Sequence, residues 1–207
     1  MLRNLFSAFL VATCISSVVA EDRPLAANAK EISPLKAGDV LPDVSVKDAT
    51  GKTVKLSAYH TDGPLVIVFF RGSWCPICSR HFQELVKAHP EITRHGAKIV
   101  AISPDSVENT KGNIEKLKIP FPLLSDSDLA ATKAFGLAFK VDDATIEKYK
   151  GYGIDLVKAS GHDHHALPVP AIYIVDKSGI VKFSHSNPDY TKRLDVETIL
   201  SELKKIQ

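Results

Sequence analysis

The stretch Phe69-Phe70-Arg71-Gly72-Ser73-Trp74-Cys75-Pro76-Ile77-Cys78 joins a predicted strand to a predicted helix and carries two cysteines. The run Leu65-Val66-Ile67-Val68 just before it is apolar throughout, which is typical of a strand covered on both faces in a parallel sheet. The apolar residues that follow recur at helical spacing: Phe82, Leu85 and Val86. The dithiol is therefore expected to open a helix, with Pro76 at its first position and Pro90 at its end.

The two cysteines differ in their expected environments. Cys75 lies where free backbone N–H groups and the positive end of the helix dipole stabilise a thiolate, so its pKa is expected below the roughly 8.5 of a free cysteine. Cys78 is one turn further into the helix and is expected to be more buried. Cys75 is thus the predicted nucleophile and Cys78 the predicted resolving thiol, which together form a redox-active disulfide.

The first twenty residues have the pattern of an export signal. Arg3 supplies the positive start, the segment 5–19 is largely apolar, and small residues precede a cleavage point near Ala20. Lipidation of Cys14 is a weaker alternative, because Thr13 is a poor residue before such a cysteine. The chain is expected to be exported, periplasmic or secreted, without a membrane span after cleavage.

The composition favours one redox domain. The chain carries 26 basic and 24 acidic residues, a balance that gives no indication of nucleic-acid binding. Residues 21–37 are polar and are expected to be flexible, whereas residues 38–207 are predicted to form a single α/β domain. After signal cleavage only Cys75 and Cys78 remain, and a CxxC loop is too short to be a useful structural staple. Zinc would need more ligands than one CxxC supplies, so no cofactor is expected.

The predicted elements have a recognisable order. A hairpin over 44–56 comes first, and the dithiol helix lies between buried strands at 65–68 and 98–102. Weaker helices follow, one over 107–117 interrupted at Gly112 and one ending at Gly136, then an inserted helix and loop over 140–158. A second hairpin, 171–175 with 180–183, precedes a closing helix over 196–203.

Two resemblances follow from these residues. The motif Trp74-Cys75-Pro76-Ile77-Cys78 after an apolar strand resembles the thioredoxin active site. The order of segments resembles the peroxiredoxin-like proteins of the alkyl hydroperoxide reductase/thiol-specific antioxidant family. This implies a thioredoxin-like α/β fold, a central mixed sheet flanked by helices, with an N-terminal hairpin extension and a middle insertion. It also implies an antioxidant oxidoreductase that reduces peroxides through the dithiol and is restored by a thiol reductant.

The resemblance assigns a further role and shows two departures. A proline at the place of Pro170 is cis in thioredoxin-fold proteins and positions the substrate, whereas typical peroxiredoxins commonly have an arginine there. From the residues themselves, Trp74 is expected to form a hydrophobic lid beside the sulfur, and Arg71 is near enough in sequence to lower a thiol pKa by its charge. Peroxiredoxins share a Pro-x-x-x-Thr-x-x-Cys signature, but matching its cysteine to Cys78 puts Arg71 and Cys75 in place of the proline and threonine. Peroxide turnover is therefore expected to be slow, with readily measured disulfide exchange.

Two alternatives remain open. The protein could be an exported thioredoxin-like thiol–disulfide oxidoreductase that acts on protein disulfides. It could instead be a non-catalytic module that binds a metal or a thiol, with His162, His164 and His165 as weak candidate ligands. A solvated loop is the better interpretation of these histidines, because adjacent ligands seldom converge on one ion without support from elsewhere.

Overall fold

The computed structural model describes residues 23–206, so the predicted export signal and Cys14 lie outside the described residues. A seven-stranded sheet forms the centre of the molecule, in the order β2-β1-β5-β4-β3-β8-β9. Its strands are β1 (Ser45–Lys47), β2 (Thr53–Lys55), β3 (Leu65–Phe69), β4 (Lys98–Ser103), β5 (Leu123–Ser125), β8 (Ala171–Val175) and β9 (Val181–Ser186). Since β3 pairs in parallel with β4 and antiparallel with β8, the sheet is mixed, as predicted.

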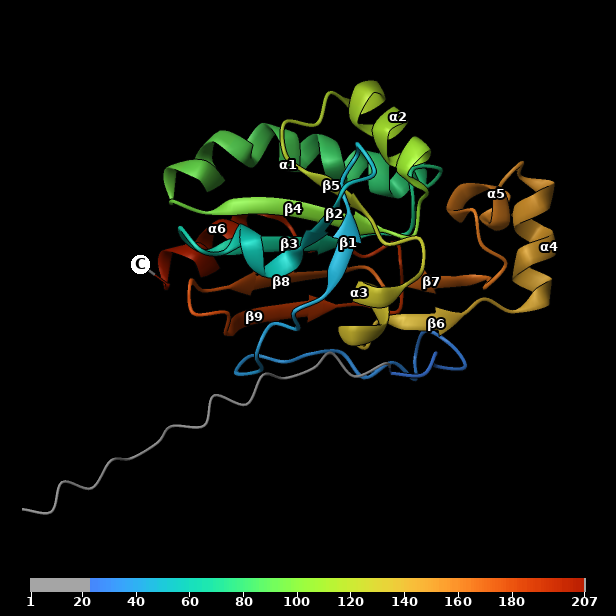
Figure 1. The fold of residues 1–207 in the computed structure, drawn as a ribbon, viewed down its shortest axis with the longest axis horizontal. Helices are drawn as coiled ribbons and strands as arrows, with labels where there is room; N and C mark the ends of the chain where they lie inside the picture. Colours follow the sequence, from blue (N-terminus) through green and yellow to red (C-terminus); the bar gives the residue numbers. More distant parts are fainter. Residues whose placement is uncertain (1–22, 207) are drawn as a thin grey trace, which may run out of the picture.

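Helices lie on both faces of this sheet (Figure 1). They are η1 (Leu56–Tyr59), α1 (Pro76–Arg94), α2 (Val107–Leu117), α3 (Ala130–Ala134), α4 (Asp143–Gly151), α5 (Leu156–Ser160) and α6 (Val196–Lys204). Val66 and Val68 of β3 pack in one cluster with α1 and α6, while Leu65, Ile67 and Phe69 pack in another with α3. None of these helices is both long and apolar enough to cross a membrane within residues 23–206.

The middle insertion forms its own small core. The strands β6 (Ala138–Lys140) and β7 (Ala166–Pro168) pair antiparallel, apart from the main sheet, and were not predicted from the sequence. Val141, Ile146, Leu156 and Leu167 cluster there. Trp74 packs against this cluster, so the insertion contacts the loop before α1. In Figure 1, α4 and α5 stand beside one end of the main sheet, at the right of the view.

The segment 23–37 is packed against the domain. The Ala26 N–H donates to the Ala138 carbonyl at 3.0 Å, and the Leu35 N–H donates to the Phe135 carbonyl at 3.2 Å. Leu35 is only 5% exposed and belongs to the core that includes α3. The prediction of a flexible segment is therefore wrong for residues 23–37, because its few apolar side chains and its backbone find partners far along the chain.

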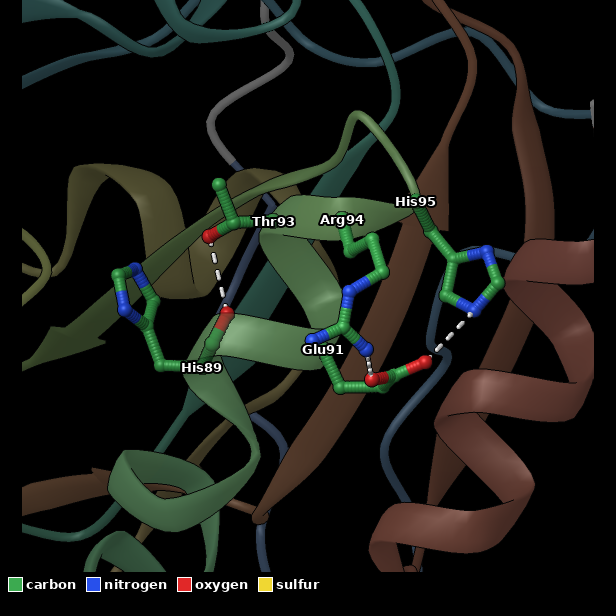
Figure 2. A network of polar contacts seen from close by, with 5 residues as sticks. All are labelled: His89, Glu91, Thr93, Arg94 and His95. Atoms are coloured by element: carbon green, nitrogen blue, oxygen red, sulfur yellow. Dashed lines mark hydrogen bonds and ion pairs between the residues drawn. The ribbon is translucent and has the colours of Figure 1, made fainter.

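Helix α1 continues past Pro90 and ends at Arg94, so the predicted end at Pro90 is wrong. The last turn is anchored by Ile92, which is fully buried in the core that α1 shares with α6. Figure 2 shows the polar contacts of this turn: Glu91 pairs with Arg94, and the Thr93 hydroxyl donates to the His89 carbonyl at 2.9 Å. His95 Nε2 lies 3.6 Å from Glu91 Oε1. Burial and side-chain contacts thus hold a turn that proline weakens.

Helix α2 is continuous where the sequence predicted an interruption. It begins after Ser106, whose hydroxyl accepts a hydrogen bond from the Asn109 N–H at 3.2 Å. It then runs through Gly112 to Leu117 without the predicted interruption. A glycine in a helix costs roughly 1 kcal/mol relative to alanine, and the rest of the helix offsets this cost.

Candidate active site

Cys75 occupies the N-cap of α1, directly before Pro76 at the first helical position. Its Sγ accepts a hydrogen bond from the Cys78 N–H at 3.4 Å. The hydrogen bond from the Cys78 side chain, together with the backbone bond and the positive charge of Arg71, lowers the pKa of Cys75 to about 6. At neutral pH the first thiol of the motif is therefore mostly a thiolate.

Cys78 has the opposite electrostatic character. Burial raises the pKa of its thiol well above the ordinary value. Arg193 Nη2 lies 3.5 Å from Cys78 Sγ, where its positive charge stabilises the thiolate form of this sulfur. Both cysteines are free thiols with almost no exposed surface, 1% for Cys75 and 2% for Cys78. Burial is the largest influence on the pKa of Cys78 and only a secondary one on that of Cys75, which fits the expectation that Cys78 lies deeper.

Arg71 supplies a positive charge beside Cys75. Its Nη1 lies 3.8 Å from Cys75 Sγ, and its Nη2 donates a hydrogen bond to the Tyr149 hydroxyl. The guanidinium carbon also lies over three aromatic rings, at 4.9 Å from the centroid of Trp74, 5.4 Å from Tyr149 and 3.9 Å from Tyr190. Cation–π contacts and the hydrogen bond hold the charge beside the sulfur. Arg71 and Trp74 thus lie together at the dithiol.

Three of these side chains were not predicted as site residues. Tyr149 belongs to α4 in the insertion, while Tyr190 and Arg193 lie in the loop between β9 and α6. The sequence offers one weak signal, the polar segment 187–193, which follows β9 and contains both Tyr190 and Arg193. Nothing in the local pattern of α4 distinguishes Tyr149 from an ordinary half-buried tyrosine, because its role depends on a contact 78 residues away.

Asp105 holds the loop that precedes Cys75. Its Oδ2 accepts hydrogen bonds from the Ser73 N–H at 2.7 Å and from the Ser103 hydroxyl at 3.0 Å. Burial raises the pKa of this carboxyl to about 6. The loop requires glycine at position 72, since φ is +146° and a Cβ would lie 2.4 Å from Trp74 Nε1 and 3.0 Å from Asp105 Oδ1.

Pro170 does not have the predicted geometry. No peptide bond within residues 23–206 is cis, so the bond between Val169 and Pro170 is trans. Pro170 directly precedes β8. At this position the N–H that proline lacks is not needed for a hydrogen bond between strands, and the ordinary trans peptide bond fits.

Pro170 lines a cavity of about 10 Å³ together with His81 and Arg193. Burial lowers the pKa of His81 to about 4, so this histidine is neutral at pH 7.

The histidine segment does not assemble a ligand set. His164 Nε2 donates to the Ser127 carbonyl at 3.1 Å, and its Nδ1 accepts from the Ala166 N–H at 3.0 Å. Both nitrogens of His164 are therefore occupied by backbone groups. The His162 and His164 rings stack with centroids 6.0 Å apart. Within residues 23–206 no three histidine, cysteine or carboxylate side chains gather as metal ligands.

The fold and the dithiol together define a class of protein: a thioredoxin-like α/β domain whose first active-site helix begins at a thiol of lowered pKa. The family model described as "AhpC/TSA family" matches residues 37–184. Since this match covers well over half of the chain, the chain belongs to the AhpC/TSA family. The predicted fold class and the predicted family are thus confirmed.

Individual relatives agree with this assignment. The chain is 27% identical over 150 residues to a chloroplastic peroxiredoxin Q of Triticum aestivum, across 72% of this chain and 58% of that protein. It is 33% identical over 106 residues to a putative peroxiredoxin of Mycobacterium tuberculosis, across 50% of this chain and 67% of that protein. The match thus spans less than two thirds of the wheat relative.

Solved structures with the same fold include two peroxiredoxins. Peroxidoxin BcpB from Mycobacterium tuberculosis superposes with a TM-score of 0.66 at 22% identity, over 84% of this chain and 99% of that chain. Peroxiredoxin Q from Xanthomonas campestris superposes with a TM-score of 0.63 at 23% identity, over 82% of this chain and 97% of that chain. At these identities the likeness bears on the fold alone.

Proposed function

We propose that this protein is a thiol-dependent oxidoreductase that reduces peroxides through Cys75 and Cys78. The observation that carries the proposal is the position of Arg71 Nη1, 3.8 Å from the Sγ of a thiol whose pKa is lowered to about 6. This places a nucleophilic thiolate and a fixed cation side by side. Membership of the AhpC/TSA family supports the same function.

The reaction balances with a peroxide and an external thiol. The Cys75 thiolate attacks one peroxide oxygen, the O–O bond breaks, and the leaving oxygen takes a proton as alcohol or water. Cys75 becomes a sulfenic acid. Cys78 then attacks its sulfur, a disulfide forms and water leaves with the Cys78 proton. A thiol reductant supplies two electrons and two protons to restore both thiols.

The two arginines have different roles in this cycle. Arg71 stabilises the Cys75 thiolate and the negative charge that develops on the leaving oxygen. Arg193 stabilises the thiolate of Cys78 when it attacks or leaves. One well-placed donor is typically worth on the order of a hundredfold in rate. Because other residues of the peroxiredoxin signature are replaced, we expect a rate above that of free cysteine and below that of a complete peroxide pocket.

The deciding experiment compares second-order rates of the reduced protein with hydrogen peroxide, an alkyl hydroperoxide and a model protein disulfide. Free cysteine thiolate under the same conditions is the reference. We expect Cys75 to react with one of the peroxides about a hundredfold faster than the reference, and Arg71→Met to remove most of this advantage. Peroxide rates equal to those of free thiolate would reject the proposal.

A second candidate function is exchange with protein disulfides. The pairing of a low-pKa thiol with a buried high-pKa thiol in a CxxC motif favours it, since such pairs release mixed disulfides efficiently. Fast reaction with the protein disulfide and no peroxide advantage would establish this function in its place.

We also propose that the chain is exported and cleaved near Ala20. The charged start, apolar body and small residues of the first twenty positions support this. Sequencing the N-terminus of the protein recovered from the periplasm or the medium tests it. An intact Met1 in a cell-retained protein would contradict export.

A further inference from the structure

The peroxide step needs a proton that Arg71 does not supply. When the O–O bond breaks, the leaving oxygen departs as an alcohol or as water only after a proton reaches it. Arg71 stabilises the negative charge on this oxygen, but a guanidinium keeps its protons in proteins. Both Cys75 and Arg71 are buried, so bulk water has little access to the reacting atoms. A proton donor that belongs to the protein is therefore expected beside Arg71.

The Tyr149 hydroxyl lies on the second arm of the same guanidinium. Arg71 Nη1 is 3.8 Å from Cys75 Sγ, and Arg71 Nη2 donates a hydrogen bond to the Tyr149 oxygen. Since both nitrogens belong to one rigid planar group, the sulfur and the hydroxyl lie next to each other around one cation. A leaving oxygen that pairs with Arg71 is therefore placed beside the Tyr149 hydroxyl.

This hydroxyl has a hydrogen to give. An arginine only donates hydrogen bonds, so the Tyr149 oxygen accepts from Arg71 and its own hydrogen points elsewhere. Within residues 23–206, no second hydrogen-bond partner of this hydroxyl is found. Burial raises the pKa of Tyr149 above its ordinary value, and the positive charge of Arg71 partly opposes this. The phenol therefore keeps its proton at neutral pH, and Arg71 stabilises the phenolate that forms when the proton leaves.

The insertion holds the Tyr149 ring in this position. The ring centroids of Tyr149 and Trp74 are 5.6 Å apart, and the guanidinium carbon of Arg71 lies 5.4 Å from the centroid of Tyr149. Both aromatic rings also pack against the small core that Val141, Ile146, Leu156 and Leu167 form. Helix α4 thus presents a hydroxyl of fixed orientation at the dithiol, as a proton donor in an active site requires.

We propose that Tyr149 is a further catalytic residue, the acid that protonates the leaving oxygen of the peroxide. The inference rests on the proposed peroxide cycle and assigns one of its steps. The Cys75 thiolate attacks the terminal oxygen of the hydroperoxide, and the S–O bond forms as the O–O bond breaks. The leaving oxygen takes the hydroxyl proton of Tyr149. The products are the Cys75 sulfenic acid, an alcohol or water, and a Tyr149 phenolate paired with Arg71.

The proton transfer is favourable in this direction. Hydroxide and alkoxides bind a proton far more tightly than a phenolate does. The phenolate then regains a proton from water before the next cycle, because burial keeps the pKa of Tyr149 above its ordinary value. One negative charge thus passes from the Cys75 thiolate to the phenolate and is neutralised there.

The test compares oxidants that differ in their need for a proton. Hydrogen peroxide and tert-butyl hydroperoxide leave behind a hydroxide or an alkoxide, whereas peracetic acid leaves behind acetate, a stable anion at neutral pH. All three convert the Cys75 thiolate to the sulfenic acid. Second-order rates are measured on the reduced protein at pH 8, where Cys75 is a thiolate. The fluorescence of Trp74, the single tryptophan of the chain, follows the reaction.

Three variants separate the proton donor from the cation. Tyr149→Phe removes the hydroxyl and keeps the ring beside Trp74. Arg71→Met is the matched comparison, since it removes the cation and keeps the hydroxyl. Tyr152→Phe is the control for loss of a phenol, because Tyr152 lies at the end of the same helix and is exposed.

We expect Tyr149→Phe to lower the rates with hydrogen peroxide and tert-butyl hydroperoxide by about tenfold or more, and to leave the rate with peracetic acid within about twofold. In heavy water the native protein should react with hydrogen peroxide about twofold more slowly, because a proton moves in the transition state. Tyr149→Phe should lose this isotope effect, whereas Arg71→Met should react slowly and keep it. Tyr152→Phe should match the native protein in every rate.

An equal loss with all three oxidants in Tyr149→Phe would overturn the inference, since the hydroxyl would then act only by holding Arg71. The same isotope effect in Tyr149→Phe and in the native protein would also overturn it, because the proton would then come from another group. Failure of the proposed function gives a different result: native rates equal to those of free cysteine thiolate with every oxidant.

Discussion

At the scale of single residues, the reactivity of Cys75 depends on the groups that contact its sulfur and on the side chains that hold those groups in place. The Cys78 side chain and backbone supply hydrogen bonds, and Arg71 supplies charge. Tyr149 and Tyr190 in turn hold Arg71 in place. The thiolate is therefore stabilised both by its position at the helix N-terminus and by a cation that is fixed from outside the motif.

The first prediction concerns the pH dependence of the two thiols. Alkylation of Cys75 by iodoacetamide should rise with a midpoint near pH 6, while Cys78 should remain unmodified at neutral pH because burial raises its pKa. Mass spectrometry of the reduced protein after timed labelling measures both rates. The same pKa shift affects stability: because folding lowers the pKa of Cys75, ionisation of this thiol increases the free energy of unfolding at high pH, and this contribution is lost as the pH falls through about 6. Equal labelling of the two cysteines at pH 7 would contradict the assignment.

The second prediction concerns the support of Arg71. Tyr149→Phe removes the acceptor for Arg71 Nη2 and keeps the ring, so the guanidinium should lose part of its alignment with Cys75 Sγ. We expect the pKa of Cys75, read from the same labelling profile, to rise by about half a unit.

Tyr152→Phe is the control for this change, because Tyr152 lies at the end of the same helix and is 68% exposed. An unchanged labelling profile in Tyr149→Phe would show that the cation–π contacts alone hold Arg71.

At the scale of the elements, α1 shows how tertiary contacts override a local signal. Proline inside a helix removes a hydrogen bond and clashes with the preceding turn, and Pro90 stands four residues before the end of α1. The last turn nevertheless forms, because Ile92 is buried and Glu91 pairs with Arg94. Its contacts therefore offset a helix-breaking residue.

The third prediction follows from this balance. Pro90→Ala should restore the backbone hydrogen bond to Val86 and raise the free energy of unfolding by about 1–2 kcal/mol, after allowance for the freer unfolded chain. Urea denaturation of the reduced protein measures the change. Lys87→Ala, at an exposed position of the same helix, should change stability by about 0.5 kcal/mol or less. A loss of stability in Pro90→Ala would mean that the turn needs the fixed φ of proline.

At the scale of the whole molecule, segments far apart in the sequence close the domain around the sheet. The segment 23–37 runs along β6 and the end of α3 through backbone hydrogen bonds. In the same way, the insertion with α4 and α5 packs its small core against Trp74. Both segments are therefore part of the folded unit that holds the dithiol loop.

The fourth prediction tests the N-terminal segment. Leu35→Ala should lower the free energy of unfolding by about 2–4 kcal/mol, because it removes a buried side chain from the core shared with α3. Lys36→Ala next to it is exposed and should change stability by about 0.5 kcal/mol or less. Equal stability of both variants in urea denaturation would show that the segment contributes no core.

The sequence by itself determined the elements whose signals are local. The apolar run of β3, Pro76 at the start of α1 and the spacing of Cys75 and Cys78 were each visible in a few adjacent residues. Strand burial, helix initiation and helix-terminus stabilisation act over one turn or one strand, so these predictions needed no knowledge of the rest of the chain. The family resemblance added the order of the elements.

Only the tertiary structure decided what surrounds the thiols. Tyr149 is 78 residues from Arg71, and Arg193 is 115 residues from Cys78, yet each pair is in contact. The short strands β6 and β7 likewise form because they pair with each other, since three-residue strands carry no periodic pattern of their own. These contacts form because the whole chain folds together to bury its apolar surface. No local pattern of residues specifies which distant segments will then be in contact.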